Sequence, residues 1–191
     1  MNQSQYPSPE KQIILPKHDT YFYRLMHHKG KELPRSYKWF KRLNRIVVPL
    51  YRLRILPLFG IGWFILMITT IGRRTGKTYR TPVEFHRING VIHITAGRGE
   101  TTDWVRNIRA NPENVQVQVG FRCFQPRIEI IDNISEKEKF IEWMIKNLPR
   151  EAEMGFGWNR KKDDLKCTDL TPLANFLTII RLHKPSQENS S

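Results

Sequence analysis

The amino-acid sequence predicts an α+β fold that is mainly β, either a small antiparallel barrel or a sheet with helices at its side. Alternating apolar and polar residues recur in short runs between positions 79 and 131, as half-buried strands require. Two or three segments with helical spacing accompany these runs. The length of 191 residues and the 39% hydrophobic content suffice for one domain with a real core, which excludes a wholly disordered chain.

The first 35 residues are predicted to form an irregular arm, because prolines and polar residues punctuate them. One short helix is expected within the arm, over 21–28. From Ser36 onward, apolar residues recur at helical spacing with lysines and arginines on the opposite side. This pattern predicts a basic amphipathic helix that Ser36 caps and that Pro49 ends at about Val48.

Residues 55–71 form a run of 17 residues that carries no charge. That length lies at the lower edge for a membrane span, and Pro57 and two glycines oppose a continuous helix. We expect a buried strand over 63–71, where aromatic and β-branched residues gather. The alternatives are a membrane-spanning helix and peripheral membrane contact by the first 60 residues.

A hairpin and a short helix are predicted next along the chain. Residues 79–88 and 91–96 read as two strands joined by an Asn-Gly pair, which suits a two-residue turn. A helix is expected over 101–110, with Thr101 or Thr102 as its N-cap. The Asn-Pro pair that follows would stop this helix.

The remaining segments continue the order of strands and helices. The pattern predicts strands over 115–119 and 123–131, a helix to about Leu148, a charged loop over 149–172 and a last strand over 176–182. Ser135 and Glu138 match a capping box at the start of that helix. No internal repeat is visible.

The formal net charge of +14 is the first functional indication, because 32 basic residues face only 18 acidic ones. A field this positive attracts nucleic acid, an anionic membrane or a small polyanion. Residues 1–60 hold 12 basic and 3 acidic residues, a net of +9. Cys123 and Cys167 lie too far apart for a zinc site or disulfide framework, which favours a reducing, cytoplasmic compartment. The N-terminus shows no signal-peptide pattern.

The sharpest motif is the glycine-bounded turn of residues 72–78, Gly-Arg-Arg-Thr-Gly-Lys-Thr. A P-loop needs four residues between its glycines and a helix afterward, whereas this motif has three and leads into a strand pattern with Pro82. The turn presents Arg73, Arg74, Lys77 and Arg80. These side chains either form an ordinary solvated turn or act as a clamp for phosphate or carboxylate groups.

A second constellation joins the end of one strand to the start of a helix. Ala96, Gly97 and Arg98 precede the predicted helix, and glycine there lets a ligand approach the backbone. The helix start offers free N–H donors. Taken alone, this segment is better explained by a plain loop and helix cap.

The stretch 66–131 resembles the deazaflavin-dependent nitroreductase family. Three segments carry the match: residues 69–77 followed by Pro82, the strand end at 95–98, and the run Asp-Trp-Val-Arg-Asn-Ile-Arg-Ala-Asn-Pro at 103–112. The resemblance implies a split β-barrel like that of the FMN-binding oxidoreductases, with flanking helices and an N-terminal amphipathic helix. It also implies coenzyme F420, which is similar to a flavin that carries a phosphodiester and an oligoglutamate tail.

The resemblance assigns cofactor contacts to three groups of residues in this chain. The phosphate side would be Arg73, Arg74, Thr75, Gly76 and Lys77; the strands beside the deazaflavin would supply Tyr79, Arg80, Pro82, Val83, Thr95, Ala96, Gly97 and Arg98; the covering helix would supply Trp104 and Asn107. The cofactor would exchange hydride with a quinone, enone or nitro-type acceptor that is small and apolar. No catalytic residue is assigned, and Glu84, Tyr79 and the six histidines remain open as proton donors.

The chain departs from the family pattern at several positions. Many members carry two basic residues shortly before the motif proline, where this chain has Tyr79 and then Arg80. Glu84, Phe156 and Trp158 stand in regions where the nitroreductase prototype has tyrosines. Nitroimidazole reduction therefore does not follow from the resemblance.

The predicted organisation is an arm over 1–35, a barrel domain over 36–185 and a tail over 186–191. FMN on the same fold is the alternative cofactor, and a basic nucleic-acid-binding protein is the alternative function. We expect no nucleic acid partner, because no reader helix or stacking motif is present. A homodimer and contact with the inner face of the plasma membrane remain open.

Overall fold

The computed structural model describes residues 13–27, 35–60 and 63–185, and leaves the side chains of 35–41 and 43 undescribed. Internal contacts divide the chain into two compact units. Unit 1 joins the residues up to 27 with 132–176, and unit 2 holds 28–131 with the residues from 177 onward. The predicted boundaries of the arm, the barrel domain and the tail remain predictions.

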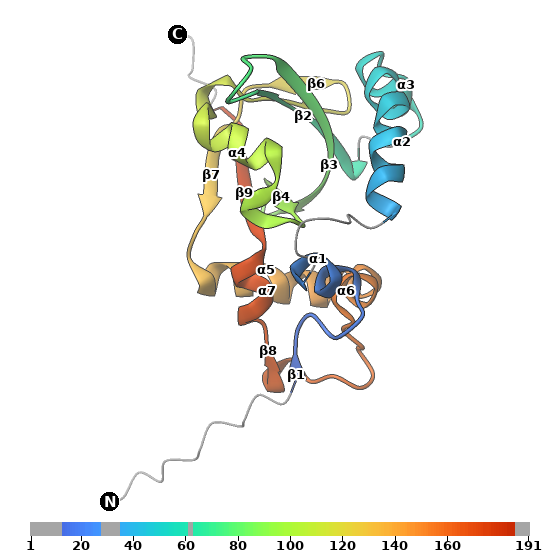
Figure 1. Cartoon of the computed structure of the whole chain (residues 1–191), viewed down its shortest axis with the longest axis vertical. Helices are drawn as coiled ribbons and strands as arrows, with labels where there is room; N and C mark the ends of the chain where they lie inside the picture. Colours follow the sequence, from blue (N-terminus) through green and yellow to red (C-terminus); the bar gives the residue numbers. More distant parts are fainter. Residues whose placement is uncertain (1–12, 28–34, 61–62, 186–191) are drawn as a thin grey trace, which may run out of the picture. The chain divides into compact units, whose positions relative to one another are not determined.

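Unit 2 is built on a seven-stranded antiparallel sheet, which confirms the predicted α+β class with a mainly β body (Figure 1). In spatial order its strands are β6 (Arg122–Phe124), β5 (Gln116–Val119), β2 (Ile65–Ile71), β3 (Thr78–Ile88), β4 (Val91–Ala96), β9 (Thr178–His183) and β7 (Arg127–Ile131). The predicted hairpin is confirmed: β3 pairs with β4, with Phe85 opposite Ile94.

The predicted continuous strand over 123–131 is wrong, because the segment forms two strands on different sheet edges. β6 pairs with β5, with Cys123 opposite Gln118, while β7 pairs with β9. Pro126 lies between the two and has no N–H for a ladder, so pairing stops there. The chain thus crosses between opposite edges of the sheet.

The core of unit 2 fills one face of the sheet. The following buried side chains come from five strands, helix α4 (Asp103–Ala110) and the segment just before β5: Leu66, Ile68, Val83, Phe85, Ile92, Ile94, Ile108, Val115, Val117, Ile180 and Leu182. Their period of two along each strand places alternate residues on this face. Burial of these side chains is the main source of stability in this unit.

A polar ladder crosses the other face of three neighbouring strands. Arg181 on β9 donates to Glu129 on β7 at 2.7 Å and to His93 on β4 at 3.3 Å. His183 bonds the second oxygen of Glu129 at 2.6 Å. These two partners hold the pKa of the Glu129 carboxyl below its ordinary value, first through His183 and then Arg181. Burial lowers the pKa of His93.

Helix α2 (Arg35–Arg52) confirms a helix near the predicted position, but its predicted end is wrong. Pro49 lies inside the helix, and the N–H of Leu53 still donates to the Pro49 carbonyl at 2.9 Å. Pro49 is exposed, so water can reach the backbone carbonyl that its missing N–H leaves unpaired. No helix among the described residues is long and apolar enough to span a membrane.

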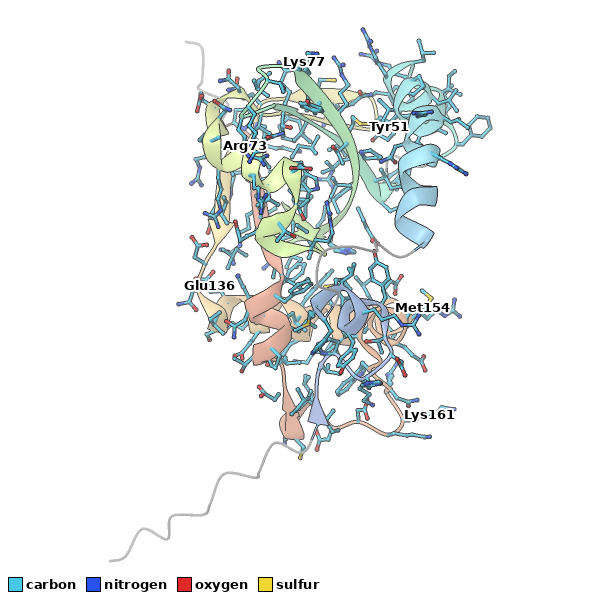
Figure 2. All side chains as sticks on the ribbon, in the orientation of Figure 1. Tyr51, Arg73, Lys77, Glu136, Met154 and Lys161 are labelled. Atoms are coloured by element: carbon cyan, nitrogen blue, oxygen red, sulfur yellow. The ribbon has the colours of Figure 1, made fainter. Side chains whose placement is uncertain are left out.

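Tyr51 anchors the end of α2 to the sheet (Figure 2). Its side chain is fully buried. The hydroxyl donates to the Ile65 carbonyl at 2.8 Å and accepts from the Gly120 N–H at 3.0 Å. Burial raises the pKa of this phenol. The contact fixes the start of β2 and the β5–β6 turn relative to α2.

The strand predicted over 63–71 is observed as β2, which starts at Ile65, two residues later than expected. Trp63 is 85% exposed rather than buried, and its N–H donates to the Gly60 carbonyl in a turn. A short helix, α3 (Ile55–Leu58), precedes this turn and contains Pro57. The expectation that no continuous helix crosses the uncharged run is confirmed within the described residues.

Unit 1 is mainly helical. It contains β1 (Ile13–Ile14), α1 (Tyr21–His27), α5 (Ile134–Asn147), α6 (Pro149–Phe156), β8 (Thr168–Asp169) and α7 (Thr171–Phe176), with β1 parallel to β8. The short helix predicted in the arm is confirmed by α1. The predicted loop over 149–172 is wrong, because α6, β8 and the start of α7 lie within it.

The capping box predicted for α5 is also wrong. Asn133 is the N-cap, and its side chain accepts from the Glu136 N–H at 3.2 Å. The helix therefore starts one residue before Ser135, which lies inside the first turn. Asn and Ser are comparable N-cap residues. The Ser135–Glu138 spacing therefore predicted the start of α5 at the wrong residue.

Candidate functional site

A tight turn between β2 and β3 carries most of the predicted anion-binding residues. The Gly72 N–H donates to the Lys77 carbonyl at 2.8 Å, and the Gly76 N–H donates to the Gly72 carbonyl at 2.8 Å. Gly76 has φ +65°, a backbone conformation that glycine adopts without strain. A Cβ on Gly72 would come within 2.5 Å of the Tyr79 ring, so a side chain there would displace Tyr79. The turn is thus compact and specified by its glycines.

Asn107 of α4 holds this turn from the side. Its side-chain oxygen accepts from both the backbone N–H and the guanidinium of Arg73, each at 3.2 Å. Its amide donates to Thr70 Oγ1 at 3.3 Å. Asn107 is only 5% exposed, so these bonds form largely out of water. Asp103 adds an exposed contact to Arg73 at 3.4 Å.

This arrangement separates the arginines of the turn into two roles. The Arg73 side chain is 23% exposed and bonded to α4, which Figure 2 shows beside it. Arg74, Lys77 and Arg80 are exposed, and within the described part of the chain none has an ion pair or side-chain hydrogen bond. Figure 2 shows Lys77 at the end of the hairpin, away from the body of the sheet. These three cations are therefore available to an anionic ligand.

The start of β3 places a phenol beside the cations. The Tyr79 hydroxyl lies 3.2 Å from Thr75 Oγ1, and Tyr79 is 45% exposed. Thr75 Oγ1 also accepts from the Lys77 N–H at 3.3 Å. Further along β3, Pro82 is half-buried and Val83 faces the core. Among the cofactor contacts predicted on β3, the polar and accessible residues are therefore Tyr79 and Arg80.

The second predicted segment lies at the end of β4. Ala96 is buried at 2% exposure, and Gly97 and Arg98 are half-buried. Thr95 Oγ1 is buried with no hydrogen-bond partner among the described residues. Thr102, one of the two predicted caps, occupies the N-cap position of α4 but makes no capping bond, and its Oγ1 likewise lacks a described partner.

Sequence reasoning missed the residue that braces this segment. Glu100 accepts from Arg109 of α4 through both carboxylate oxygens, at 2.7 and 2.8 Å, and from Thr178 of β9 at 2.8 Å. Its carbonyl accepts from Arg106 at 2.9 Å. Glu100 and Arg109 lie nine positions apart, and a short 3-10 helix at Gly99–Thr101 reorients the chain between them. No helical or strand spacing could have paired them.

Helix α4 contributes apolar contacts as well as Asn107. Val105 and Ile108 are fully buried, and Trp104 packs half-buried against the core of unit 2. Of the open proton donors, Tyr79 and Glu84 are exposed at the surface of β3. Within the described residues, no group of three or more His, Cys, Asp or Glu side chains could hold a metal ion.

The comparisons with known proteins give a family match and several distant structural matches. A family model for F420H(2)-dependent quinone reductase matches residues 56–160. No curated protein matches. A structure named F420-H2 dependent reductase (FDR-A) matches with 22% identity and a TM-score of 0.40, over 62% of this chain and 93% of its own.

Two further solved structures show similar levels of likeness. A Listeria innocua protein named as a putative pyridoxamine 5'-phosphate oxidase matches with 13% identity and a TM-score of 0.42, over 63% of this chain and 83% of its own. A chain named only as a domain-swapped dimer matches with 20% identity and a TM-score of 0.41, over 62% of this chain and 79% of its own.

Proposed function

Because this chain belongs to the F420H(2)-dependent quinone reductase family, we propose that it transfers hydride from reduced coenzyme F420 to a quinone, with enone and nitro compounds as related acceptors. The chain is an oxidoreductase whose cofactor is F420. When bound, the reduced deazaflavin supplies the hydride. The protein supplies the grip on the cofactor, its orientation and the exclusion of water.

The observation that carries the proposal is a set of three exposed cations, two on the fixed β2–β3 turn and one near the start of β3, that have no ion pair or side-chain hydrogen bond within the described residues. Arg74, Lys77 and Arg80 carry the charge that the phosphodiester and glutamate carboxylates of the cofactor would bind. Guanidinium groups bind such anions through paired N–H donors, and the lysine adds a compact charge. An anion at this turn would replace water around cations that have no described protein partner.

Arg73 and Asn107 have a different part in the proposal. Their mutual bonds, and the bond from Asn107 to Thr70, hold the turn against α4. We assign them as positioning residues for the cations beside them. A turn that is held in place before binding loses less conformational freedom when the ligand arrives.

The other predicted contacts keep their proposed place beside the deazaflavin. They are Thr75, Gly76, Tyr79, Pro82, Val83, Thr95, Ala96, Gly97, Arg98 and Trp104. The Oγ1 of Thr95, which has no hydrogen-bond partner in the described part of the chain, supports this assignment, since a buried hydroxyl without a bond is costly unless a ligand satisfies it. Val83 and Ala96 would contribute through the backbone, because their side chains face the interior.

The test is a fluorescence titration of F420 with the full chain and with the double variant Arg74→Gln/Lys77→Gln. Each charge-assisted contact contributes about 1.5–3 kcal/mol before solvent screening, so on this exposed turn we expect on the order of tenfold weaker binding per residue. Added salt should weaken wild-type binding more than binding by the double variant. FMN serves as the competing ligand.

The matched control is Lys161→Gln, because Lys161 is an exposed cation of unit 1 in a charged loop (Figure 2). Its F420 affinity should equal that of the wild type. If the control lost as much F420 affinity as the double variant, the loss would reflect net charge alone, and the assigned clamp would be rejected. Saturable FMN binding without F420 binding would reject the cofactor.

Two partner predictions belong to this proposal. The family's split barrels suit a homodimer, which size-exclusion chromatography with light scattering measures directly. The net charge of +9 over residues 1–60 favours contact with the anionic inner face of the plasma membrane.

A further inference from the structure

The most exposed apolar surface of unit 2 lies between α2 and β2. Six large apolar side chains within residues 53–64 are exposed; we call this set the apolar tip: Leu53, Ile55, Leu58, Phe59, Trp63 and Phe64. Phe59 is 79% exposed and Trp63 is 85% exposed. Single exposed apolar residues are common on protein surfaces, but six within twelve positions mark an interaction site.

The apolar tip is held in shape by its buried neighbours. Tyr51 before it and Pro57 within it are buried, and the Tyr51 hydroxyl bonds the carbonyl of Ile65 just after it. Successive backbone bonds fold the segment: the Phe59 N–H donates to the Leu56 carbonyl, and the Trp63 N–H donates to the Gly60 carbonyl, each at 3.1 Å. Figure 1 shows α3 against the end of α2. The exposed side chains therefore extend from a supported backbone.

Arginines flank this segment in the sequence, and one exposed acidic residue, Glu84, lies close to its end, opposite Ile65 on β3. Arg42, Arg45, Arg52 and Arg54 are exposed and have no ion pair within the described residues. The chain from 33 to 83 contains no aspartate or glutamate. Apolar and aromatic side chains beside arginines are the composition of surfaces that bind the headgroup region of an anionic bilayer.

We propose that the apolar tip docks on an anionic lipid bilayer, with the arginines on the phosphate groups and Phe59 and Trp63 among the acyl chains. The charge distribution favours a bilayer over a second copy of this chain. Two copies that met through the tip would bring together four exposed arginines from each copy, which one nearby carboxylate per copy, Glu84, does not offset. If the proposed acceptor is a quinone, this contact also places the protein where an apolar quinone dissolves; that link alone rests on the proposed function.

The tip is separate from the proposed cofactor clamp. It ends at Phe64, directly before β2, and the basic turn begins at Gly72, directly after β2. Seven strand residues separate them by about 20 Å, given about 3.3 Å per residue. Changes at one site can therefore be made without touching the other.

The experiment is co-sedimentation of the full chain with vesicles of phosphatidylglycerol and with vesicles of phosphatidylcholine. We expect pelleting with the anionic vesicles only, and a loss on the order of a hundredfold in affinity for Phe59→Ser/Trp63→Ser, about tenfold for each buried aromatic side chain. Arg52→Gln/Arg54→Gln should lose about fivefold per arginine. The matched control is Phe121→Ser, because Phe121 is an exposed aromatic of the same unit outside the tip.

Tryptophan emission supplies the second readout. Anionic vesicles should shift the wild-type emission to the blue, and Trp63→Phe should keep the pelleting but lose most of the shift. Equal pelleting of the wild type and of Phe59→Ser/Trp63→Ser would overturn the proposal, as would a concentration-dependent dimer that this variant abolishes while vesicles bind neither protein. F420 titration of the same variant should match the wild type, so loss of lipid binding with intact F420 binding separates this proposal from the proposed cofactor binding.

Discussion

Asn107→Ala is the sharpest test of how the β2–β3 turn is held. The change removes two bonds accepted from Arg73 at 3.2 Å and one donated to Thr70 at 3.3 Å. At about 1 kcal/mol net for each bond, the free energy of unfolding should fall by about 3 kcal/mol. For a chain of this size that corresponds to a Tm lower by about 6–12 °C. Binding of F420 should weaken as well, because the turn that carries the cations is no longer fixed.

The assay is thermal unfolding followed by circular dichroism, with F420 titration of the same preparation. Asn114→Ala is the control, since Asn114 is exposed and its side chain donates to the neighbouring Glu113 at 2.8 Å. Its free energy of unfolding should stay within about 0.5 kcal/mol of the wild type. If Asn107→Ala matched the wild type in both Tm and F420 affinity, the reasoning that α4 positions the turn would be refuted.

Two further predictions concern stability. Tyr51→Phe should lower the free energy of unfolding by about 1–3 kcal/mol in denaturant titrations, because the Gly120 N–H and the Ile65 carbonyl lose their hydroxyl partner; an unchanged midpoint would contradict the anchor. Stability should also fall in acid: the pKa of His93 is below its ordinary 6.5 and that of Glu129 is below its ordinary 4.5, so each contribution is present above the ordinary value and lost as pH falls through the folded pKa. Glu129→Gln should flatten the decline below pH 4.5, and because the Glu129 charge raises the pKa of His93, the variant should lower that pKa further, which urea midpoints across pH will show.

Local patterns predicted the sheet of unit 2 well, because strand alternation and turn chemistry act over a few residues. The Asn-Gly hairpin and the last strand follow from such patterns, with β9 at Thr178–His183 against the expected 176–182. The error at Pro126 has the same origin, since β6 and β7 have similar local patterns. Only pairing partners at opposite sheet edges distinguish them, and those partners are distant in sequence.

The site was predicted in its residue types but not in its internal bonds. The basic turn was predicted from its glycine-bounded motif, whereas Asn107 came from the family resemblance, which gave no sign that Asn107 binds Arg73 rather than a ligand. The brace from Glu100 to Arg109 could not be predicted, because it depends on how a 3-10 turn meets α4. The exposure of Trp63 was missed since hydropathy alone assigns such a residue to a core.

The central claim is that the basic turn binds the anionic part of F420. The most direct measurement compares the affinity of the full chain for F420 with its affinity for a deazaflavin that lacks the phosphodiester and glutamate tail. We predict at least about a hundredfold preference for F420, as expected for two or more charge-assisted contacts, and loss of most of that preference in Arg74→Gln/Lys77→Gln. Equal affinity of the wild type for both compounds would contradict the account.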